Sequence, residues 1–173
     1  MDKISVLISE EEVNKRIKEI AGKIDECYKG EEVHLICILK GSIFFVCELA
    51  KRMTSPVTID FMQVSSYGSK TKSSGIITVK KELDEDIEGK NVIIVEDIID
   101  SGNTLRTLKC ELEKRDPKTL KIVTLLDKPD RREVEVDVDF TGFVIPDKFV
   151  VGYGLDYDQK YRNLPYIGVV EIS

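Results

Sequence analysis

The chain has 173 residues, of which 42% are hydrophobic and 34% charged, a composition typical of one globular domain rather than a disordered or fibrous chain. Its formal net charge is −6 at pH 7, which argues against a general nucleic-acid binder or a membrane-surface protein, because both classes usually carry a basic excess. The sequence has no apolar run long enough to span a membrane, and its N-terminus, MDKISVLISEEE, lacks the apolar stretch of a signal peptide. We therefore predict one cytoplasmic domain over residues 1–173.

The four cysteines are predicted to be small buried residues in a reducing compartment. None of them forms a C-x-x-C pair, and Cys37, Cys47 and Cys110 lie in segments with apolar periodicity. Neither a zinc site nor a disulfide is expected to involve them or Cys27.

Apolar strands and amphipathic helices alternate over the first two thirds of the chain. The first predicted helix begins at the capping box of Ser9 and Glu12 and ends at Gly30. In chain order we then predict a strand over 33–39, a helix over 43–53, strands over 57–64, 76–80 and 91–96, a helix over 104–115, and strands over 120–126, 140–145, 150–155 and 167–172. This alternation indicates βαβ units and an α/β fold with a parallel sheet.

Three polar loops follow predicted buried strands, at residues 40–42, 97–103 and 127–132. Ligands of open parallel sheets bind beyond the carboxyl ends of the strands. We therefore expect the functional site where these three loops meet.

The segment VIIVEDIIDSGNTL, residues 92–105, has the most specific pattern. Its strand ends in two adjacent carboxylates, Glu96 and Asp97, which suit sugar hydroxyls or a hard cation such as Mg²⁺. A third acid and a loop of small residues then lead directly into a helix: Asp100, Ser101, Gly102, Asn103 and Thr104. A tight turn at Gly102 and the partial positive charge of a helix N-terminus predict a phosphate site. A phosphorylated ribose meets both requirements.

This segment resembles the phosphoribosyl-diphosphate signature of the type I phosphoribosyltransferases. The rest of the chain is similar to the bacterial hypoxanthine-guanine branch of that family, through LKGS, SYGSKTKSSG, LLDKPDRR and DKFVVGYGLDYDQKYRNLPYIGVV. The resemblance implies a type I phosphoribosyltransferase fold, in which a Rossmann-like core with a parallel β-sheet flanked by helices carries a small hood subdomain. The hood is expected to come from the chain ends, mainly the C-terminal strands, and a non-proline cis peptide is expected in the loop at Lys40.

The same resemblance implies a Mg²⁺-dependent transferase of purine salvage. Such an enzyme moves the 5-phosphoribosyl group from 5-phosphoribosyl 1-diphosphate to hypoxanthine or guanine, through an oxocarbenium-like transition state, and releases IMP or GMP and diphosphate. Relatives are homodimers or homotetramers, so we expect an oligomer with small-molecule partners and no nucleic acid. The apolar run FFVC at 44–47 suits either a core or an interface.

For the phosphoribosyl donor, the resemblance implies three sets of contacts. The ribose and its 5′-phosphate are expected at Glu96, Asp97, Asp100, Ser101, Gly102, Asn103 and Thr104. Diphosphate is expected at Lys40, Gly41 and Arg162, and Mg²⁺ at Glu96, Asp97 and Asp156. The guanidinium of Arg162 offers a fork of donors that fits a phosphate group.

For the purine, the resemblance implies that Asp100 is the catalytic base that takes the N7 proton. Lys128 is expected to donate to the 6-oxo group, which excludes adenine because two donors would then face each other. Phe149 is expected to stack on the base, with Val150 and Asp156 near its edge.

Residues 65–75, SSYGSKTKSSG, contain no aliphatic or acidic side chain, so this segment is predicted to be a mobile connector or a lid. The resemblance favours a lid that closes over the transition state, with Ser66 and Tyr67 as its contacts. The lone His34 lies in a buried strand and is interpreted as a core residue, and Asp158 is assigned to the surface.

Two alternative functions stay open. A xanthine-preferring phosphoribosyltransferase would share these residues, since Lys128 rejects adenine but not xanthine. A non-catalytic regulator that senses phosphoribosyl diphosphate and binds RNA would need a basic face, which the net charge of −6 makes less attractive. The chain contains no G-x-G-x-x-G motif, which argues against a dinucleotide site.

Overall fold

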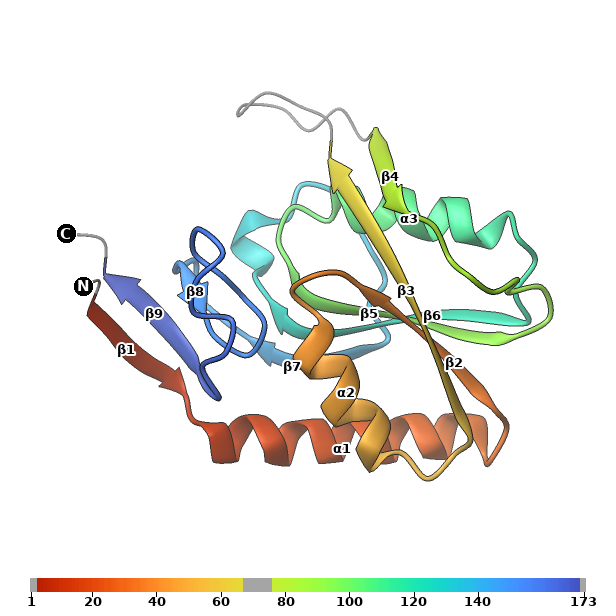
Figure 1. Ribbon diagram of the computed structural model, residues 1–173, viewed down its shortest axis with the longest axis horizontal. Helices are drawn as coiled ribbons and strands as arrows, with labels where there is room; N and C mark the ends of the chain where they lie inside the picture. Colours follow the sequence, from red (N-terminus) through yellow and green to blue (C-terminus); the bar gives the residue numbers. More distant parts are fainter. Residues whose placement is uncertain (1–2, 67–75, 172–173) are drawn as a thin grey trace.

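The structure, a computed structural model, describes residues 3–66 and 76–171. Its main sheet has the strand order β4-β3-β2-β5-β6-β7 (Figure 1). These strands are β2 Val33–Ile38, β3 Val57–Ser66, β4 Ile77–Lys81, β5 Asn91–Ile99, β6 Thr119–Asp127 and β7 Phe140–Val144. All neighbours pair in parallel except β3 and β4. The predicted α/β class with a mostly parallel sheet is confirmed.

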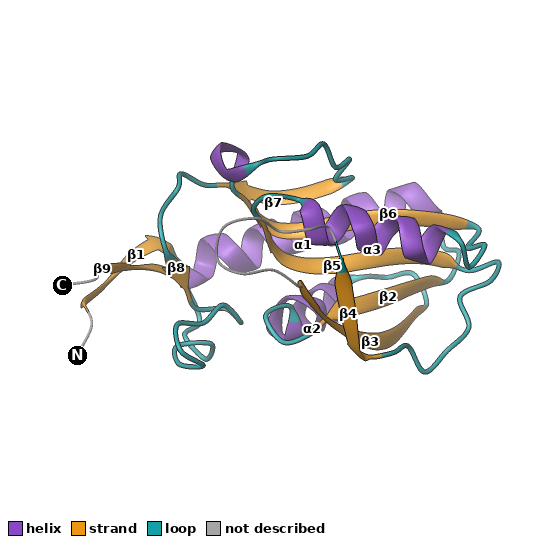
Figure 2. Ribbon diagram, turned by 90° about the horizontal axis from the view of Figure 1, so that it is seen from above, coloured by secondary structure: helices purple, strands orange, loops and turns teal. Residues whose placement is uncertain are grey.

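Helices cover both faces of this sheet (Figure 2). They are α1 Glu10–Tyr28, α2 Ile43–Arg52 and α3 Asn103–Glu113, with a short 3-10 helix, η1, at Pro129–Arg131. In β2, Leu35 and Cys37 pack in the core cluster of α1 and α2, whereas Ile36 and Ile38 pack in the cluster of α3. Because successive side chains of a strand point to opposite faces, a continuous apolar run is what a strand covered on both sides requires.

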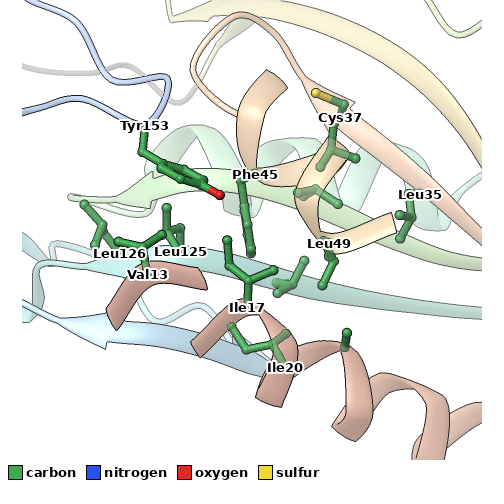
Figure 3. Close-up of a cluster of buried hydrophobic side chains, with 14 of the residues drawn as sticks. Val13, Ile17, Ile20, Leu35, Cys37, Phe45, Leu49, Leu125, Leu126 and Tyr153 are labelled. Atoms are coloured by element: carbon green, nitrogen blue, oxygen red, sulfur yellow. The ribbon is translucent and has the colours of Figure 1, made fainter. Parts of the chain in front are cut away.

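The residues that predicted the first helix form its buried face. The capping box is present: the Ser9 N–H donates to Glu12 Oε2 at 2.8 Å, and the Glu12 N–H donates to Ser9 Oγ at 3.2 Å. Figure 3 shows Ile17 and Ile20 of α1 facing Phe45 of α2 in the core. Each fully buried aliphatic side chain of this kind stabilises the fold by roughly 1.5–3 kcal/mol.

A second, smaller sheet joins the two ends of the chain. Its strands are β1 Lys3–Ile8, β8 Val150–Val151 and β9 Ile167–Glu171, in the antiparallel order β1-β9-β8 (Figure 1). The sequence pattern did not predict β1. The strand predicted over 150–155 stops at Val151, because the chain turns at Gly152, where φ is +94° and a Cβ would lie 2.0 Å from the Tyr166 carbonyl oxygen.

The other predicted elements are present, with ends that differ by a residue or two, except for the strand predicted over 91–96. That strand, β5, continues to Ile99 because Ile98 and Ile99 pair with Leu126 and Asp127 of β6. The adjacent acids at 96 and 97 therefore lie within a paired strand rather than in the loop after it.

The prediction of buried cysteines is wrong for three of the four: Cys27, Cys47 and Cys110 are exposed, and all four thiols are free. Their positions fall on the outer sides of helices, where a small residue tolerates either environment. Cys37 is buried, and burial raises the pKa of its thiol to about 12. In the run 44–47, Phe45 and Val46 belong to the core, whereas Phe44 is 43% exposed.

His34 is a core residue, as predicted, with 1% of its surface exposed. Its Nδ1 lies 2.7 Å from Thr58 Oγ1, and burial lowers the pKa of the imidazole. Asp158 is exposed, as predicted. None of the helices within the described ranges is long and apolar enough to cross a membrane.

Candidate active site

A cleft of about 440 Å³ opens at the carboxyl ends of β2 and β5. Most of the predicted site residues line it: Lys40, Gly41, Glu96, Asp97, Asp100, Ser101, Gly102, Thr104, Asp156 and Arg162. The cleft also has an apolar wall that was not predicted from the sequence, and it consists of Ile38, Leu39, Val64, Ile98, Ile99, Leu105 and Leu108. Those residues belong to ordinary core patterns, so their sequence carries no signal that separates a cleft wall from a core.

The two adjacent carboxylates of β5 have few hydrogen-bond donors. Burial raises the pKa of Asp97 to about 6, although the Ile98 N–H donates to its Oδ1 at 2.7 Å and the Arg162 charge also favours the ionised form. Burial and the neighbouring Asp97 raise the pKa of Glu96 well above its usual value. Two acids with raised pKa values beside each other form a site that a cation or hydroxyl donors would stabilise.

The loop after β2 lies directly against this acid pair. The Leu39–Lys40 peptide is cis, as the resemblance implies for this loop. A Cβ on Gly41 would lie 1.7 Å from Asp97 Oδ2, so no side chain fits there without a displacement. On its other side the Gly41 carbonyl oxygen would lie 2.0 Å from a Cβ on Gly154. The loop is therefore held between the acids of β5 and the segment after β8.

The turn into α3 has the geometry of an anion site. Gly102 has a φ of +84°, as the tight turn predicted, and α3 begins at the next residue. The carbonyl oxygen of Ser101 accepts hydrogen bonds from the Glu133 and Val134 N–H groups at 2.9 and 3.2 Å, which ties the turn to the chain after η1. The Asn103 side chain donates to Glu133 at 2.7 Å, and this residue is not among those that line the cleft.

Arg132 also supports this turn from outside the cleft. Its Nε donates to the Asp100 carbonyl oxygen at 3.1 Å, and its guanidinium forms an ion pair with Asp127 at the end of β6. The guanidinium thus links the two neighbouring loops that carry Asp100 and Lys128.

The segment 152–162 brings a second charged group to the opposite wall. Arg162 donates to the Gly154 carbonyl oxygen at 2.7 Å and forms an ion pair of 3.1 Å with Asp156. Gln159, which is not among the predicted site residues, accepts hydrogen bonds from Lys40 Nζ at 3.3 Å and from Arg162 Nη2 at 3.2 Å. The sequence offered one indication of a role for Gln159, which is its position between the predicted site residues Asp156 and Arg162 in the same loop.

Three of the four residues predicted for the purine lie beside the cleft rather than in its lining. Lys128 is buried, and its N–H donates to the Ile99 carbonyl oxygen at 3.0 Å, which places it next to Asp100. Phe149 is 45% exposed and packs edge-to-face on Tyr157, with ring centroids 5.5 Å apart. Val150 is buried in β8. An exposed aromatic ring offers a stacking surface, and the ammonium group of a lysine offers hydrogen-bond donors.

The predicted metal ligands do not form a complete site by themselves. Among the described residues, no group of three or more His, Cys, Asp or Glu side chains could hold a metal ion. Mg²⁺, however, commonly takes one or two carboxylates and completes its shell with water and substrate phosphates. The Glu96–Asp97 pair fits that pattern, whereas the Asp156 carboxylate is engaged by Arg162.

The predicted lid falls almost entirely outside the described residues. Of its eleven positions, 65 and 66 end β3 and Ser66 is exposed, whereas Tyr67 and the following positions to 75 are not described.

Comparison with known proteins decides the family. A phosphoribosyl transferase domain matches residues 8–158. The chain belongs to the phosphoribosyl transferase family. A hypoxanthine phosphoribosyltransferase of Salmonella typhimurium is 53% identical to this phosphoribosyltransferase over 169 residues, which cover 96% of this chain and 95% of the relative. A hypoxanthine-guanine phosphoribosyltransferase of Streptococcus pneumoniae is 48% identical, with coverage of 96% and 92%.

A solved structure shows the same likeness in three dimensions. The hypoxanthine-guanine phosphoribosyltransferase of Bacillus anthracis superimposes on this phosphoribosyltransferase with a TM-score of 0.95 at 48% identity, and the match covers 99% of this chain and 100% of that one. The resemblance stated from the sequence is therefore confirmed, and the fold is that of the type I phosphoribosyltransferases.

Proposed function

We propose that this phosphoribosyltransferase transfers the 5-phosphoribosyl group of 5-phosphoribosyl 1-diphosphate to hypoxanthine or guanine, and that it releases IMP or GMP and diphosphate. The observation that carries the proposal is the cleft itself, which unites a phosphate-binding turn at Gly102, the acid pair of β5 and two cationic side chains, Lys40 and Arg162. Relatives with about 50% identity over nearly the whole chain carry the names of these activities. The proposed role is purine salvage.

The donor would lie across the cleft, with its 5′-phosphate at the turn before α3 and its diphosphate at the opposite wall. Its 5′-phosphate would accept hydrogen bonds from the turn at 101–104 and gain from the partial positive charge of the α3 N-terminus. Its diphosphate would lie against Lys40, the Gly41 N–H and Arg162, which offset the charge that builds on the leaving group. The ribose hydroxyls would then face the acid pair.

Mg²⁺ is proposed as the cofactor, held through Glu96 and Asp97 together with oxygen atoms of the donor. When bound, the metal ion would neutralise negative charge on the diphosphate as the glycosidic bond breaks. Asp156, which the resemblance also implies as a ligand, would act through Arg162 in the arrangement described here.

The purine would enter beside Asp100, between Phe149 and the apolar wall of the cleft. Lys128 would donate to the 6-oxo group, and the Asp100 carboxylate would accept the N7 proton as the bond to ribose forms. Asp100 is exposed at the cleft mouth, where it can reach a bound base. Closure by residues 65–75, with Ser66 and Tyr67 as contacts, would exclude water from the oxocarbenium-like transition state.

A spectrophotometric assay tests this function directly. Purified enzyme would be given 5-phosphoribosyl 1-diphosphate and Mg²⁺ with hypoxanthine, guanine, xanthine or adenine in turn. We expect turnover of the first two bases, its loss with EDTA, and a kcat at least about tenfold lower in Asp100→Ala. Asp158→Ala is a matched control, because this exposed acid lies outside the cleft lining and should leave kcat unchanged.

The other outcomes of this assay would each support one of the alternative functions. Preferred turnover of xanthine would make it a xanthine phosphoribosyltransferase. Binding of the donor with no turnover of any base, together with saturable RNA binding at physiological salt, would contradict the enzyme and favour the regulator.

We also propose that this phosphoribosyltransferase is a cytoplasmic homodimer or homotetramer with a single catalytic domain. The exposed Phe44 on α2 supports an interface, and four free thiols suit a reducing compartment. Light scattering after size-exclusion chromatography would give the mass. A monomeric mass at micromolar concentration would contradict the oligomer.

A further inference from the structure

Two cations of the cleft meet at one neutral side chain. Lys40 follows β2, and Arg162 lies at the end of the segment after β8, so 122 positions separate them in the chain. The Gln159 Oε1 atom accepts a hydrogen bond from each, at 3.3 Å from Lys40 Nζ and at 3.2 Å from Arg162 Nη2. This amide oxygen is therefore the link between the two walls of the proposed diphosphate site.

The chemistry of this link matters because the two cations repel each other. A neutral acceptor can hold both side chains without neutralising them, since the amide carries no charge. Arg162 is already bound to the Gly154 carbonyl oxygen and to Asp156, whereas the Lys40 ammonium has its one hydrogen bond to the described part of the chain at Gln159. Lys40 thus depends on Gln159 for its direction more than Arg162 does.

The backbone holds Gln159 in an unusual conformation. Its φ is +64°, in the left-handed region that residues other than glycine and asparagine rarely adopt. Its N–H donates to Asp156 Oδ2 at 2.9 Å, which fixes the turn from within the same loop. Asp158 and Tyr161 also have positive φ values, of 50° and 73°. A strained loop that persists around one contact is a pattern found at functional sites.

We propose that Gln159 is a positioning residue for the diphosphate end of the donor. In the free enzyme it holds the Lys40 and Arg162 side chains side by side, and the arriving diphosphate then accepts the hydrogen bonds that these two side chains donate to the Gln159 oxygen. The proposal rests on the proposed function, because Gln159 holds two residues that line the same cleft, although it does not line the cleft itself. Gln159 itself need not touch the purine or the reacting carbon atom.

Two variants separate this role from a structural one. Gln159→Gly removes the side chain and also relieves the positive φ, so the fold should be at least as stable as the wild type. Gln159→Asn keeps an amide and suits the left-handed backbone, but it is one methylene shorter and cannot span both cations. For both variants we expect the KM for 5-phosphoribosyl 1-diphosphate to rise about fivefold to twentyfold, because Lys40 and Arg162 are no longer held in place and binding must itself order both side chains.

Three further kinetic constants show whether the effect is confined to the diphosphate end of the donor. The inhibition constant of inorganic diphosphate should rise in parallel with the KM of the donor, while the KM for hypoxanthine and kcat stay within about twofold. Asp158→Gly is the matched control, since it relieves a positive φ of 50° in the exposed residue next to Gln159, whereas the hydrogen bonds to Lys40 and Arg162 come from Gln159. Its constants should equal those of the wild type.

An unchanged KM for the donor in both variants would overturn the proposal. So would a joint loss of kcat, of affinity for both substrates and of melting temperature, which would show that Gln159 only maintains the loop. Absence of turnover in the wild-type enzyme would instead contradict the proposed function, so the two failures are distinguishable.

Discussion

Asp25 and Asp97 lie at opposite ends of the parallel sheet, and their carboxylates have different hydrogen-bond partners. Near the amino end, Asp25 of α1 accepts hydrogen bonds from the Thr54 and Ser55 N–H groups at 2.8 and 3.0 Å, and another from Thr54 Oγ1 at 3.0 Å. At the carboxyl end, Asp97 accepts one from the N–H of Ile98 at 2.7 Å and lies beside another acid. The Asp25 carboxylate thus accepts more hydrogen bonds than the Asp97 carboxylate does.

The pKa values follow this difference. Burial on its own would raise the pKa of Asp25, but the hydrogen bonds from Thr54 and Ser55 lower it below its usual value of 3.8. Burial raises the pKa of Asp97 to about 6, because the backbone hydrogen bonds that its carboxylate accepts and the Arg162 charge do not compensate. Asp97 is more deeply buried than Asp25 and accepts fewer hydrogen bonds, and both differences raise its pKa relative to that of Asp25.

The largest effect is expected where the carboxyl end is most crowded. Gly41→Ala would place a Cβ 1.7 Å from Asp97 Oδ2, so the loop or the carboxylate must move. A displacement of about 1 Å in a catalytic arrangement can cost about a hundredfold in rate, and we expect kcat/KM to fall at least that much. Steady-state kinetics with hypoxanthine measures it, and a variant with wild-type kcat/KM would show that the loop tolerates the displacement.

Gly22→Ala is the matched control. A Cβ at this position of α1 would meet nothing within 4 Å. Alanine in a helix interior is more stable than glycine by roughly 0.5–1 kcal/mol, so the melting temperature should rise slightly while the kinetics stay unchanged.

Asp25→Asn should weaken the amino end. The amide would present a donor to the Thr54 N–H and hydroxyl, so at least one hydrogen bond is lost, at a cost of about 2 kcal/mol and a fall of about 4–8 °C in melting temperature. Because the folded-state pKa is lowered, the carboxylate contributes stability above its usual pKa of 3.8 that is lost as pH falls through the lower value. Thermal unfolding at pH 7.5 and in acid checks both points. An equal melting temperature at pH 7.5 would show that these hydrogen bonds contribute little.

Asp97→Asn should stabilise the fold at neutral pH, whereas Asp25→Asn should destabilise it. The folded-state pKa is raised from 3.8 to about 6, so the wild-type fold loses stability as pH rises across that range and stays less stable above it. After allowance for solvent screening at this partly exposed group, we expect the asparagine variant to gain about 1 kcal/mol, or about 2–4 °C, at pH 7.5. The gain should disappear below pH 4. A loss of stability at pH 7.5 would mean that Asp97 is structurally paired rather than strained.

Local periodicity was enough to predict the main sheet and its helices. Val13, Ile17 and Ile20 recur at helical spacing, and the apolar run of β2 requires cover on both faces. The strand β1 escaped prediction because its partner, β9, lies at the other end of the chain, and Val6 in it is 59% exposed. A strand whose stability depends on a distant partner has little local signal.

For a similar reason, the residues of the site within one segment could be predicted, whereas the contacts between separate loops could not. The motif at 92–105 is contiguous, so its acids and its turn could be read from order alone. The contact of Gly41 with Asp97 and the link from Gln159 to Lys40 join separate loops, and neither distance is encoded by spacing within one segment. The cysteines were misplaced because a residue as small as cysteine does not reveal which side of a helix is buried.

The pairing of β1 with β9 has a consequence during synthesis on the ribosome. Among the described strands β1 is hydrogen-bonded to β9 alone, so it has no partner until residues 167–171 leave the exit tunnel. At about 5–20 residues per second, that interval lasts of the order of ten to thirty seconds. Through it the nascent chain exposes an unpaired strand, while the segment that supplies Arg162 is also still being made.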